Sequence, residues 1–240
     1  YADGCLYVAG GKGKPQTVPI GKDGSQTAPT NPLFSLQLTP SLQKEWVRLP
    51  DFPGPARVQP VLTAQQSEDG IRLYLAGGFQ PASAHQEAIV CTDMLSYHPK
   101  TKQWRNEGFL PSLAGGSHRT VTGGCAIASG DSSILLVGGV NYDRFRDALN
   151  HPEPDYLLHP ADWYKFNTSL LQYNTFTKHW THLGNYEELA RAGAGIANNA
   201  NTVIIIGGEL KPGIRTPEVN AFKLIILSRK YSTTQNNNQE

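Results

Sequence analysis

Four copies of one short phrase divide the chain into stretches of similar length. Each copy is an apolar run that ends in a glycine pair, and they read LYVAGG, LYLAGG, ILLVGG and VIIIGG, with first glycines Gly10, Gly77, Gly138 and Gly207. The intervals of about 60 to 70 residues are too long for one helix pair of a solenoid and suit a four-stranded unit with extended loops. The repeat therefore predicts a series of four-stranded antiparallel units.

Two further elements recur with the glycine pairs. One is a Tyr, a polar turn and a Trp, in YHPKTKQW (Tyr97 to Trp104) and YNTFTKHW (Tyr173 to Trp180), with a looser version ending at Trp46. A strand that carries the Tyr, a reversing turn and a strand that begins at the Trp make a hairpin signature. The other is a turn rich in small residues before the next apolar run: FPGPARVQP, LPSLAGGSHRTVTGG and LARAGAGIA.

These elements together resemble the kelch repeat of β-propellers. The resemblance implies an all-β fold in which each four-stranded blade is stable only between neighbours, since it has two faces to bury. Glycine allows positive φ and close approach of blades, while Tyr and Trp fill the space between sheets. We interpret the glycine pairs as architecture rather than as a phosphate cradle, because no GxGxxG or GxxxxGK phrase precedes a helix.

The repeats and the kelch resemblance together predict one kelch-type β-propeller domain, with about three and a half blades present of six. Its expected parts are blades near 1–60, 61–122 and 123–195, a partial blade at 196–229, an insertion at 140–169 and a disordered tail at 230–240. Propellers usually have four to eight blades, so this number should not close a ring. Either blades are missing from this chain or it completes itself by association, as a homo-oligomer. The insertion is aromatic and partly helical in pattern, and we expect it to form a lid or shoulder beside the third blade.

Composition excludes several classes of function. The chain has 21 basic and 20 acidic residues, and no basic run is long enough to follow a phosphate backbone, so nucleic acid is not expected as a partner. No apolar segment approaches the roughly 20 residues that cross a bilayer, and the start at Tyr1 shows no signal peptide. Cys5, Cys91 and Cys125 follow no metal spacing and fit small buried hydrophobes.

The stretch IIIGGELKPGIRT, from Ile204 to Thr216, carries the strongest chemical signal. Glu209 directly follows the fourth glycine pair, and Pro212 with Gly213 suits a type II turn that returns Arg215 to it. In a propeller this position faces the funnel at one mouth of the ring. A carboxylate beside a guanidinium is favoured in its charged form and burial disfavours that form, so their balance decides whether it exchanges protons near neutral pH. A surface ion pair is the alternative.

The phrase GELKPGIRT, together with FPGPAR, GGVN and FNTSLLQYNTFTKHW, resembles the N-acetylneuraminate (sialic acid) mutarotase or epimerase family of kelch propellers. The likeness runs from the first glycine pair to about Val219, and the loop from Lys12 to Asn31 resembles the cyclically permuted relatives as well. It implies interconversion of the α and β anomers of a sialic acid by ring opening and reclosure. It also implies no metal or redox cofactor, and a periplasmic or secreted location.

The resemblance implies Glu209 as proton acceptor and donor. The planar fork of Arg215 suits a clamp for the substrate carboxylate or a stabiliser of developing negative charge. Arg57, His118 and Asn141 lie at equivalent blade ends and are further candidates for substrate binding. Their alternatives are a salt bridge between blades for Arg57, a structural hydrogen bond for His118 and a left-handed turn position for Asn141. Lys211 is expected to point to solvent. The aromatic residues of the insertion suit stacking on a sugar or a small core of their own.

A kelch interaction or glycan-binding module without chemistry remains the main rival. Such a module has no need for a Glu directly after the glycine pair with an Arg returned to it. A copper-radical oxidase on the same scaffold would need a Cys that can cross-link to a Tyr near the axis together with His ligands. The three cysteines lie within or beside predicted strands and no His pair is suitably placed, which argues against it.

Overall fold

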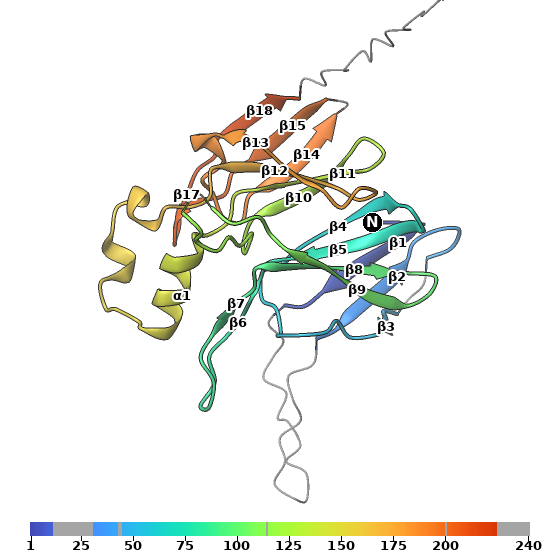
Figure 1. The fold of residues 1–240 in the computed structure, drawn as a ribbon, viewed down its shortest axis with the longest axis horizontal. Helices are drawn as coiled ribbons and strands as arrows, with labels where there is room; N and C mark the ends of the chain where they lie inside the picture. Colours follow the sequence, from blue (N-terminus) through green and yellow to red (C-terminus); the bar gives the residue numbers. More distant parts are fainter. Residues whose placement is uncertain (12–30, 43–44, 114, 200, 225–240) are drawn as a thin grey trace, which may run out of the picture.

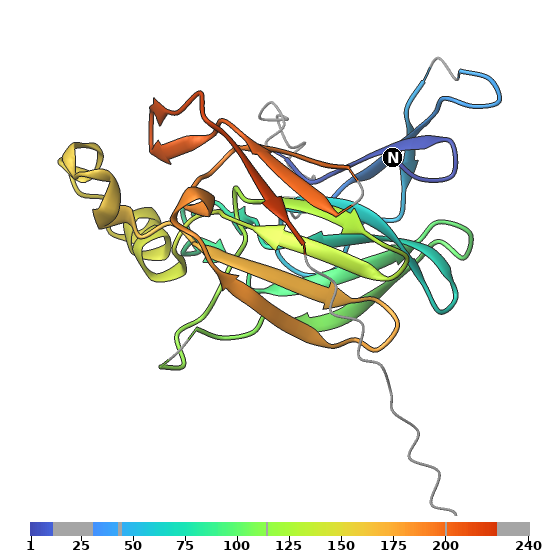
Figure 2. The ribbon, with the colours of Figure 1, turned by 90° about the horizontal axis from the view of Figure 1, so that it is seen from above.

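The computed structural model describes residues 1–11, 31–42, 45–113, 115–199 and 201–224. The predicted tail at 230–240 and nearly all of the Lys12 to Asn31 loop lie outside these residues. The described strands form four successive antiparallel sheets that follow one another around an arc (Figures 1 and 2). None of the described helices is both long and apolar enough to span a bilayer.

Two four-stranded sheets stand between two three-stranded ones. Sheet 1 contains β1 (Cys5–Ala9), β2 (Leu33–Gln37) and β3 (Val47–Leu49). Sheet 2 contains β4 (Val61–Ser67), β5 (Gly70–Ala76), β8 (Asp93–His98) and β9 (Gln103–Phe109). Sheet 3 contains β10 (Cys125–Ser129), β11 (Ser133–Val137), β12 (Ser169–Asn174) and β13 (Trp180–Asn185). Sheet 4 contains β14 (Gly195–Asn199), β15 (Thr202–Ile206) and β18 (Val219–Lys223). The strands β4, β10 and β14 are neighbours along the inner side of the arc.

Short elements project from the ends of the sheets. Two two-stranded ribbons follow glycine pairs: β6 (Phe79–Gln80) with β7 (Ile89–Val90), and β16 (Glu209–Lys211) with β17 (Ile214–Arg215). The segment between β11 and β12 holds α1 (Tyr142–Asn150) and the 3-10 helices η1 (Tyr156–Leu158) and η2 (Ala161–Tyr164), and η3 (Glu187–Leu189) precedes sheet 4. Figure 1 shows α1 and the rest of this segment standing to one side of the sheets.

The Tyr and Trp of the repeated phrases pack between sheets, as the hairpin pattern predicts. Tyr97 pairs with Trp104 across β8 and β9, and Tyr173 pairs with Trp180 across β12 and β13. Their ring centroids lie 5.0 Å and 4.8 Å apart, and both tyrosines are fully buried. Each phrase therefore forms a hairpin whose aromatic pair fills the gap to a neighbouring blade.

A buried polar cluster joins sheets 2 and 3. The Tyr173 hydroxyl donates to Glu107 Oε2 at 2.9 Å, and Arg105 Nε donates to the other carboxylate oxygen at 2.8 Å. Burial alone raises the pKa of Glu107, but the hydrogen bonds from Ser96, Arg105 and Tyr173 outweigh it and hold that pKa below its usual range. The ionised carboxylate is thus part of the contact between the two blades.

The glycine pairs stand where neighbouring blades meet most closely. A Cβ at Gly138, whose φ is +65°, would lie 2.6 Å from the carbonyl oxygen of Arg191. A Cβ at Gly77 would lie 2.9 Å from the backbone nitrogen of Thr122. Since real Cβ atoms do not approach so closely, the runs that end at Gly77 and Gly138 need glycine there for the blades to pack.

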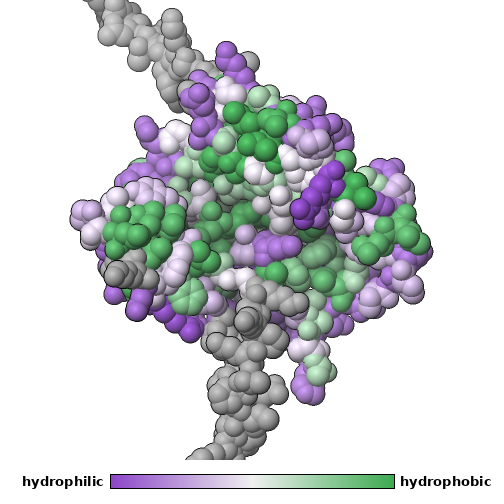
Figure 3. Space-filling view, turned by 180° about the vertical axis from the view of Figure 1, so that it is seen from behind, coloured by the Kyte–Doolittle hydropathy of each residue, from purple (hydrophilic) through white to green (hydrophobic). Residues whose placement is uncertain are grey.

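The two end sheets differ from the two middle sheets in what covers them. Leu6 and Val8 of β1 are exposed, as are Ile206 of β15 and Val219 of β18. Figure 3 shows apolar side chains gathered over these two ends of the arc. By contrast, Leu75, Leu135 and their neighbours in the middle sheets are buried. A blade flanked on both sides buries both faces, whereas the end blades each leave one face uncovered in the described structure.

The cysteines behave as hydrophobes. Cys91 and Cys125 are free and buried, and Cys5 is free and half-buried. Burial raises the pKa of the Cys91 and Cys125 thiols to about 11, so both stay protonated near neutral pH.

Candidate active site

The position directly after the glycine pair has similar backbone surroundings in three sheets, with two hydrogen bonds in sheets 2 and 4 and one in sheet 3. Phe79 exchanges two backbone hydrogen bonds with Val58 at 2.8 and 3.0 Å, and Glu209 does the same with Ala192 at 2.7 and 3.0 Å. Val140 donates to the equivalent carbonyl in sheet 3 at 3.0 Å. Two of the three side chains are apolar and the third is a carboxylate. The frame of the repeat therefore has no need for a charge here, and Glu209 requires another explanation.

Glu209 and Arg215 face each other on one ribbon. They are register partners across β16 and β17, and the turn between them has Gly213 at φ +78°, as a type II turn after Pro212 requires. Arg215 Nε lies 3.3 Å from Glu209 Oε1. The Glu209 side chain is 30% exposed and that of Arg215 is 80% exposed. Such an open pair adds little to stability, and both groups remain available to a ligand.

A cavity of about 680 Å³ opens beside this pair. Its lining includes strand-end residues of sheets 2, 3 and 4 together with Phe145, Tyr156 and Phe166 from the segment between β11 and β12. Both Glu209 and Arg215 line it. A concave site of this size, with aromatic walls and a few polar groups, is typical of a small-molecule site.

Arg57 is not among the residues that line the cavity. Its side chain is fully buried, its Nη2 donates to Asp93 Oδ2 at 2.7 Å, and its Nη1 donates to the carbonyl oxygen of Gly77 at 3.0 Å. Arg191 makes the equivalent contacts two repeats later, in sheet 4, with Glu218 at 2.8 Å and the carbonyl of Gly207 at 3.2 Å. These arginines hold the glycine turns of the blades, which is the structural alternative raised for Arg57.

His118 and Asn141 also lie off the cavity lining. The His118 ring is exposed and meets the edge of Tyr142 at 5.2 Å between centroids. The Asn141 side chain caps α1 by accepting from Arg144 N at 3.0 Å, and its φ of −70° is extended rather than left-handed. The structure therefore brings Glu209 and Arg215 together in the cavity and does not place Arg57, His118 or Asn141 on its lining.

Lys211 does not point to solvent, contrary to expectation. Its ammonium donates to the carbonyl oxygens of His159 at 2.6 Å and of Leu157 at 3.2 Å. A helix as short as η1 leaves its carbonyl oxygens without a helical hydrogen-bond donor, and Lys211 supplies one. The contact ties the ribbon that carries Glu209 to the segment that supplies Tyr156.

The segment's aromatic residues form a small core, and three of them also line the cavity, so stacking on a sugar stays a prediction. Trp163 meets the edges of Tyr156 and Tyr164 at 5.9 and 5.1 Å between centroids, which makes a small core. Phe145, Tyr156 and Phe166 also reach the cavity. Tyr156 thus belongs both to the small core and to the cavity lining. Its packing on Trp163 therefore fixes how its ring is presented to the cavity.

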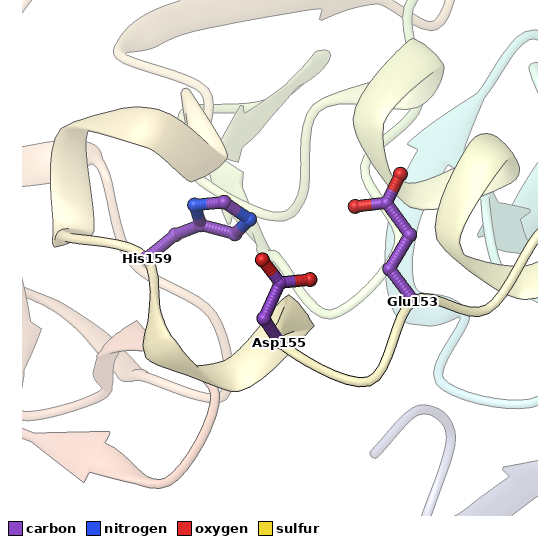
Figure 4. A group of neighbouring side chains, drawn as sticks. All are labelled: Glu153, Asp155 and His159. Atoms are coloured by element: carbon purple, nitrogen blue, oxygen red, sulfur yellow. The ribbon is translucent and has the colours of Figure 1, made fainter.

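Glu153, Asp155 and His159 form a separate cluster on this segment (Figure 4). Their ligand atoms lie within 4.8 Å of one another, and both carboxylates are exposed. The His159 ring stacks on Trp163 with centroids 3.8 Å apart. None of the three lines the cavity, so the cluster stands apart from the Glu209 and Arg215 pair.

Gln59 lines the cavity and was not expected from the sequence. Alignment of the small-residue turns could have found it, since the glutamine of VQP stands where the other repeats have glycine, at Gly123 and Gly193. The turns differ in length and spacing, which hides this correspondence until the backbone is known.

Comparison with known proteins agrees with the fold and the sequence phrase. The family profile described as N-acetylneuraminate epimerase matches residues 9–237. The chain belongs to the N-acetylneuraminate epimerase family. The resemblance inferred from the Glu209 phrase is therefore confirmed.

Individual relatives give the extent of the likeness. The N-acetylneuraminate epimerase of Pasteurella multocida (strain Pm70) is 27% identical over 215 residues, which cover 84% of this chain and 52% of the relative. That of Yersinia enterocolitica (serotype O:8, biotype 1B) is 30% identical over 189 residues, covering 72% of this chain and 45% of the relative. The chain thus spans about half the length of the curated relatives it matches.

A solved structure, titled "Structure of YjhT", superimposes with a TM-score of 0.63 at 26% sequence identity. The match covers 82% of this chain and 60% of that one. Together with the four antiparallel sheets, it confirms the prediction of an all-β, kelch-type β-propeller.

Proposed function

We propose that this chain carries the active site of a sugar mutarotase that interconverts the α and β anomers of N-acetylneuraminate. The observation that carries the proposal is a carboxylate at a repeat position that is apolar in sheets 2 and 3. This carboxylate is held against a guanidinium in a cavity of about 680 Å³. Membership of the family supports the same substrate class.

The reaction needs a proton taken from one oxygen and a proton given to another. Glu209 accepts the proton of the anomeric hydroxyl as the bond between the anomeric carbon and the ring oxygen breaks. The protonated Glu209 then gives that proton to the ring oxygen, and the open keto form results. Rotation about the bond that joins the keto carbon to the rest of the chain turns its other face to the hydroxyl. The reverse proton transfers then close the ring with the other anomeric configuration. Atoms and charge balance without any redox step.

The position of Arg215 suits this substrate in particular. In a sialic acid the carboxylate and the anomeric hydroxyl are bonded to the same carbon, so the groups that bind them must be neighbours in the site. Arg215 Nε and Glu209 Oε1 are 3.3 Å apart, and a guanidinium can hold two carboxylate oxygens at once. Binding would transfer Arg215 in part from Glu209 to the substrate and free the carboxylate to accept a proton.

Proton NMR exchange between the anomers of N-acetylneuraminate tests the proposal. We expect the chain to accelerate exchange at a pH where the spontaneous rate is low, and Glu209→Gln to abolish the acceleration. Glu188→Gln, which alters an exposed carboxylate in η3, is the matched control and should change nothing. Equal acceleration by Glu209→Gln would refute the acid/base role.

A glycan-binding module without catalysis is the second candidate, favoured by the aromatic wall of Phe145, Tyr156 and Phe166. It predicts that N-acetylneuraminate binds the chain, as seen by saturation-transfer NMR, while the exchange rate stays at its spontaneous value. The two candidates are thus separated by one sample measured in two ways.

A further inference from the structure

Three consecutive blades place one residue each in the same left-handed turn. These residues are Gln59, Gly123 and Gly193, with φ values of +54°, +69° and +63°. Gly123 N donates to the carbonyl oxygen of Gln59 at 3.0 Å, and Gly193 N donates to that of Gly123 at 2.7 Å. The backbone links make them equivalent positions along the inner edge of the arc.

Gln59 is the unusual member of this series. Left-handed φ is sterically disfavoured for any residue with a Cβ, and glutamine has no special tolerance for it such as Asn or Asp has. The backbone link does not explain the side chain, because Gly123 makes the equivalent link without one. The structure therefore holds a side chain here at a cost that the neighbouring blades avoid.

The Gln59 side chain reaches toward the cavity. The residue is exposed and lines the same cavity as Glu209 and Arg215. A Cβ at Gly123 would lie 3.7 Å from Gln59 Oε1, so the amide lies across the glycine of the next blade. Gly123 and Gly193 then separate it from the ribbon of Glu209 along the lining.

We infer that Gln59 is a substrate-binding residue that hydrogen-bonds a neutral polar substituent of the sugar, on the side away from the anomeric carbon. The inference rests on the proposed function, because Glu209 and Arg215 fix which end of the substrate faces sheet 4. A carboxamide offers two N–H donors and an acceptor oxygen, which matches the paired donor and acceptor of an acetamido or hydroxyl group. A left-handed backbone at this position directs that amide into the cavity.

Gln59→Gly converts the position to the residue of the other two blades. We expect the KM for N-acetylneuraminate to rise roughly 3- to 10-fold, the loss of one or two neutral hydrogen bonds, with kcat nearly unchanged. Thermal stability should hold or rise, since relief of the left-handed strain offsets the greater chain entropy of glycine. Gln59→Asn, which keeps a shorter amide and tolerates positive φ, should give an intermediate KM.

Lys102→Gly is the matched control. Lys102 has φ +57° in the turn between β8 and β9 and does not line the cavity. The Lys102→Gly variant should change the melting temperature as Gln59→Gly does and leave the KM for N-acetylneuraminate unaltered. A substrate analogue with a hydroxyl in place of the acetamido group identifies the contact. A smaller Gln59→Gly effect on the analogue assigns the amide to the acetamido group, and an equal effect assigns it to a hydroxyl.

Two outcomes would overturn the inference alone while the unmodified chain still accelerates exchange. One is an unchanged KM in Gln59→Gly, and the other is a melting temperature well below that of Lys102→Gly, which would mark the side chain as structural. If the unmodified chain neither binds N-acetylneuraminate nor accelerates exchange, the proposed function fails and this inference fails with it.

Discussion

The strand ends after Gly78 and after Gly208 have the same backbone and opposite uses. Phe79, at the first, packs edge-on against Phe145 of α1 with 5.1 Å between ring centroids. Glu209, at the second, meets Arg215 across its own ribbon and lines the cavity. The repeat thus fixes the backbone and leaves the side chain beyond the glycine pair free to pack, as Phe79 does, or to face the cavity, as Glu209 does.

The arginines behind these strand ends show the opposite tendency. Arg57 and Arg191 both bond to the carbonyl of the first glycine of the pair and to a carboxylate, Asp93 and Glu218 respectively. Both arginine side chains are at most 2% exposed. The buried arginine that holds the glycine turn is thus repeated in sheets 2 and 4. The residue that follows the turn is not repeated, since it is Phe79 in one sheet and Glu209 in the other.

Glu209→Phe would make the fourth blade resemble the second and has the largest expected effect. We expect the acceleration of anomer exchange to fall by about 10² to 10⁴, the usual contribution of a positioned acid/base, while the fold persists because the frame accepts Phe at this position. Exchange NMR with a thermal melt of the same sample measures both. A variant that still accelerates exchange would show that Glu209 does not transfer the proton.

Arg57→Ala tests whether the frame depends on the buried arginine. Removal leaves Asp93 and the carbonyl of Gly77 without their partner, and we expect a loss of about 3 to 4 kcal/mol in the free energy of unfolding. Arg191→Ala should cost less, because the Glu218 side chain is 66% exposed whereas that of Asp93 is 22% exposed. Urea denaturation compares the two, and equal losses would contradict the dependence on burial.

Phe79→Glu is the reverse exchange and should give no second site. In the ribbon of β6 and β7 the register partner of residue 79 is Val90, so a glutamate there has no arginine comparable to Arg215. The contact with Phe145 is also lost. We expect a destabilisation of about 2 kcal/mol, from the apolar burial that is removed, and an unchanged exchange rate per folded molecule. Higher exchange activity than in the unmodified chain would show that the frame alone creates chemistry.

Acid should weaken the contact between the middle sheets, with the smallest of these effects. The pKa of Glu107 is lower in the folded chain than in the unfolded chain, so its contribution is complete above the unfolded value of about 4.3 and is lost as the pH falls through the folded value. Melting temperatures measured from pH 6 to pH 3 should fall less steeply in Glu107→Gln than in the unmodified chain. Parallel curves would show that Glu107 does not contribute.

Local sequence spacing predicted the features whose partners are close in the chain. The glycine pairs, the Tyr and Trp hairpins and the Glu209 and Arg215 pair each depend on a turn of a few residues, whose conformational requirements are visible in the letters. The repetition of these phrases predicted the propeller, and the resemblance to the family added the expected reaction and substrate.

Features that depend on distant partners could not be predicted in the same way. Arg57 meets Asp93 because the pairing of β4, β5 and β8 brings the two together, and nothing near Arg57 in the sequence identifies that carboxylate. Asn141 begins a helix, and its cap to Arg144 N is as compatible with its sequence as a left-handed turn. Gln59 became visible only when the backbone showed which glycines it replaces.

The placement of Glu209 and Arg215 on a single ribbon separates two properties of the site. Their mutual geometry is set by one tight turn, so it survives small shifts of one blade against another. Gln59 reaches the same cavity from two blades away, so its distance from that pair changes whenever the arc opens or tightens. The curvature of the propeller would then govern how selectively a sugar is held, while the turnover of a sugar already seated would depend on the ribbon alone.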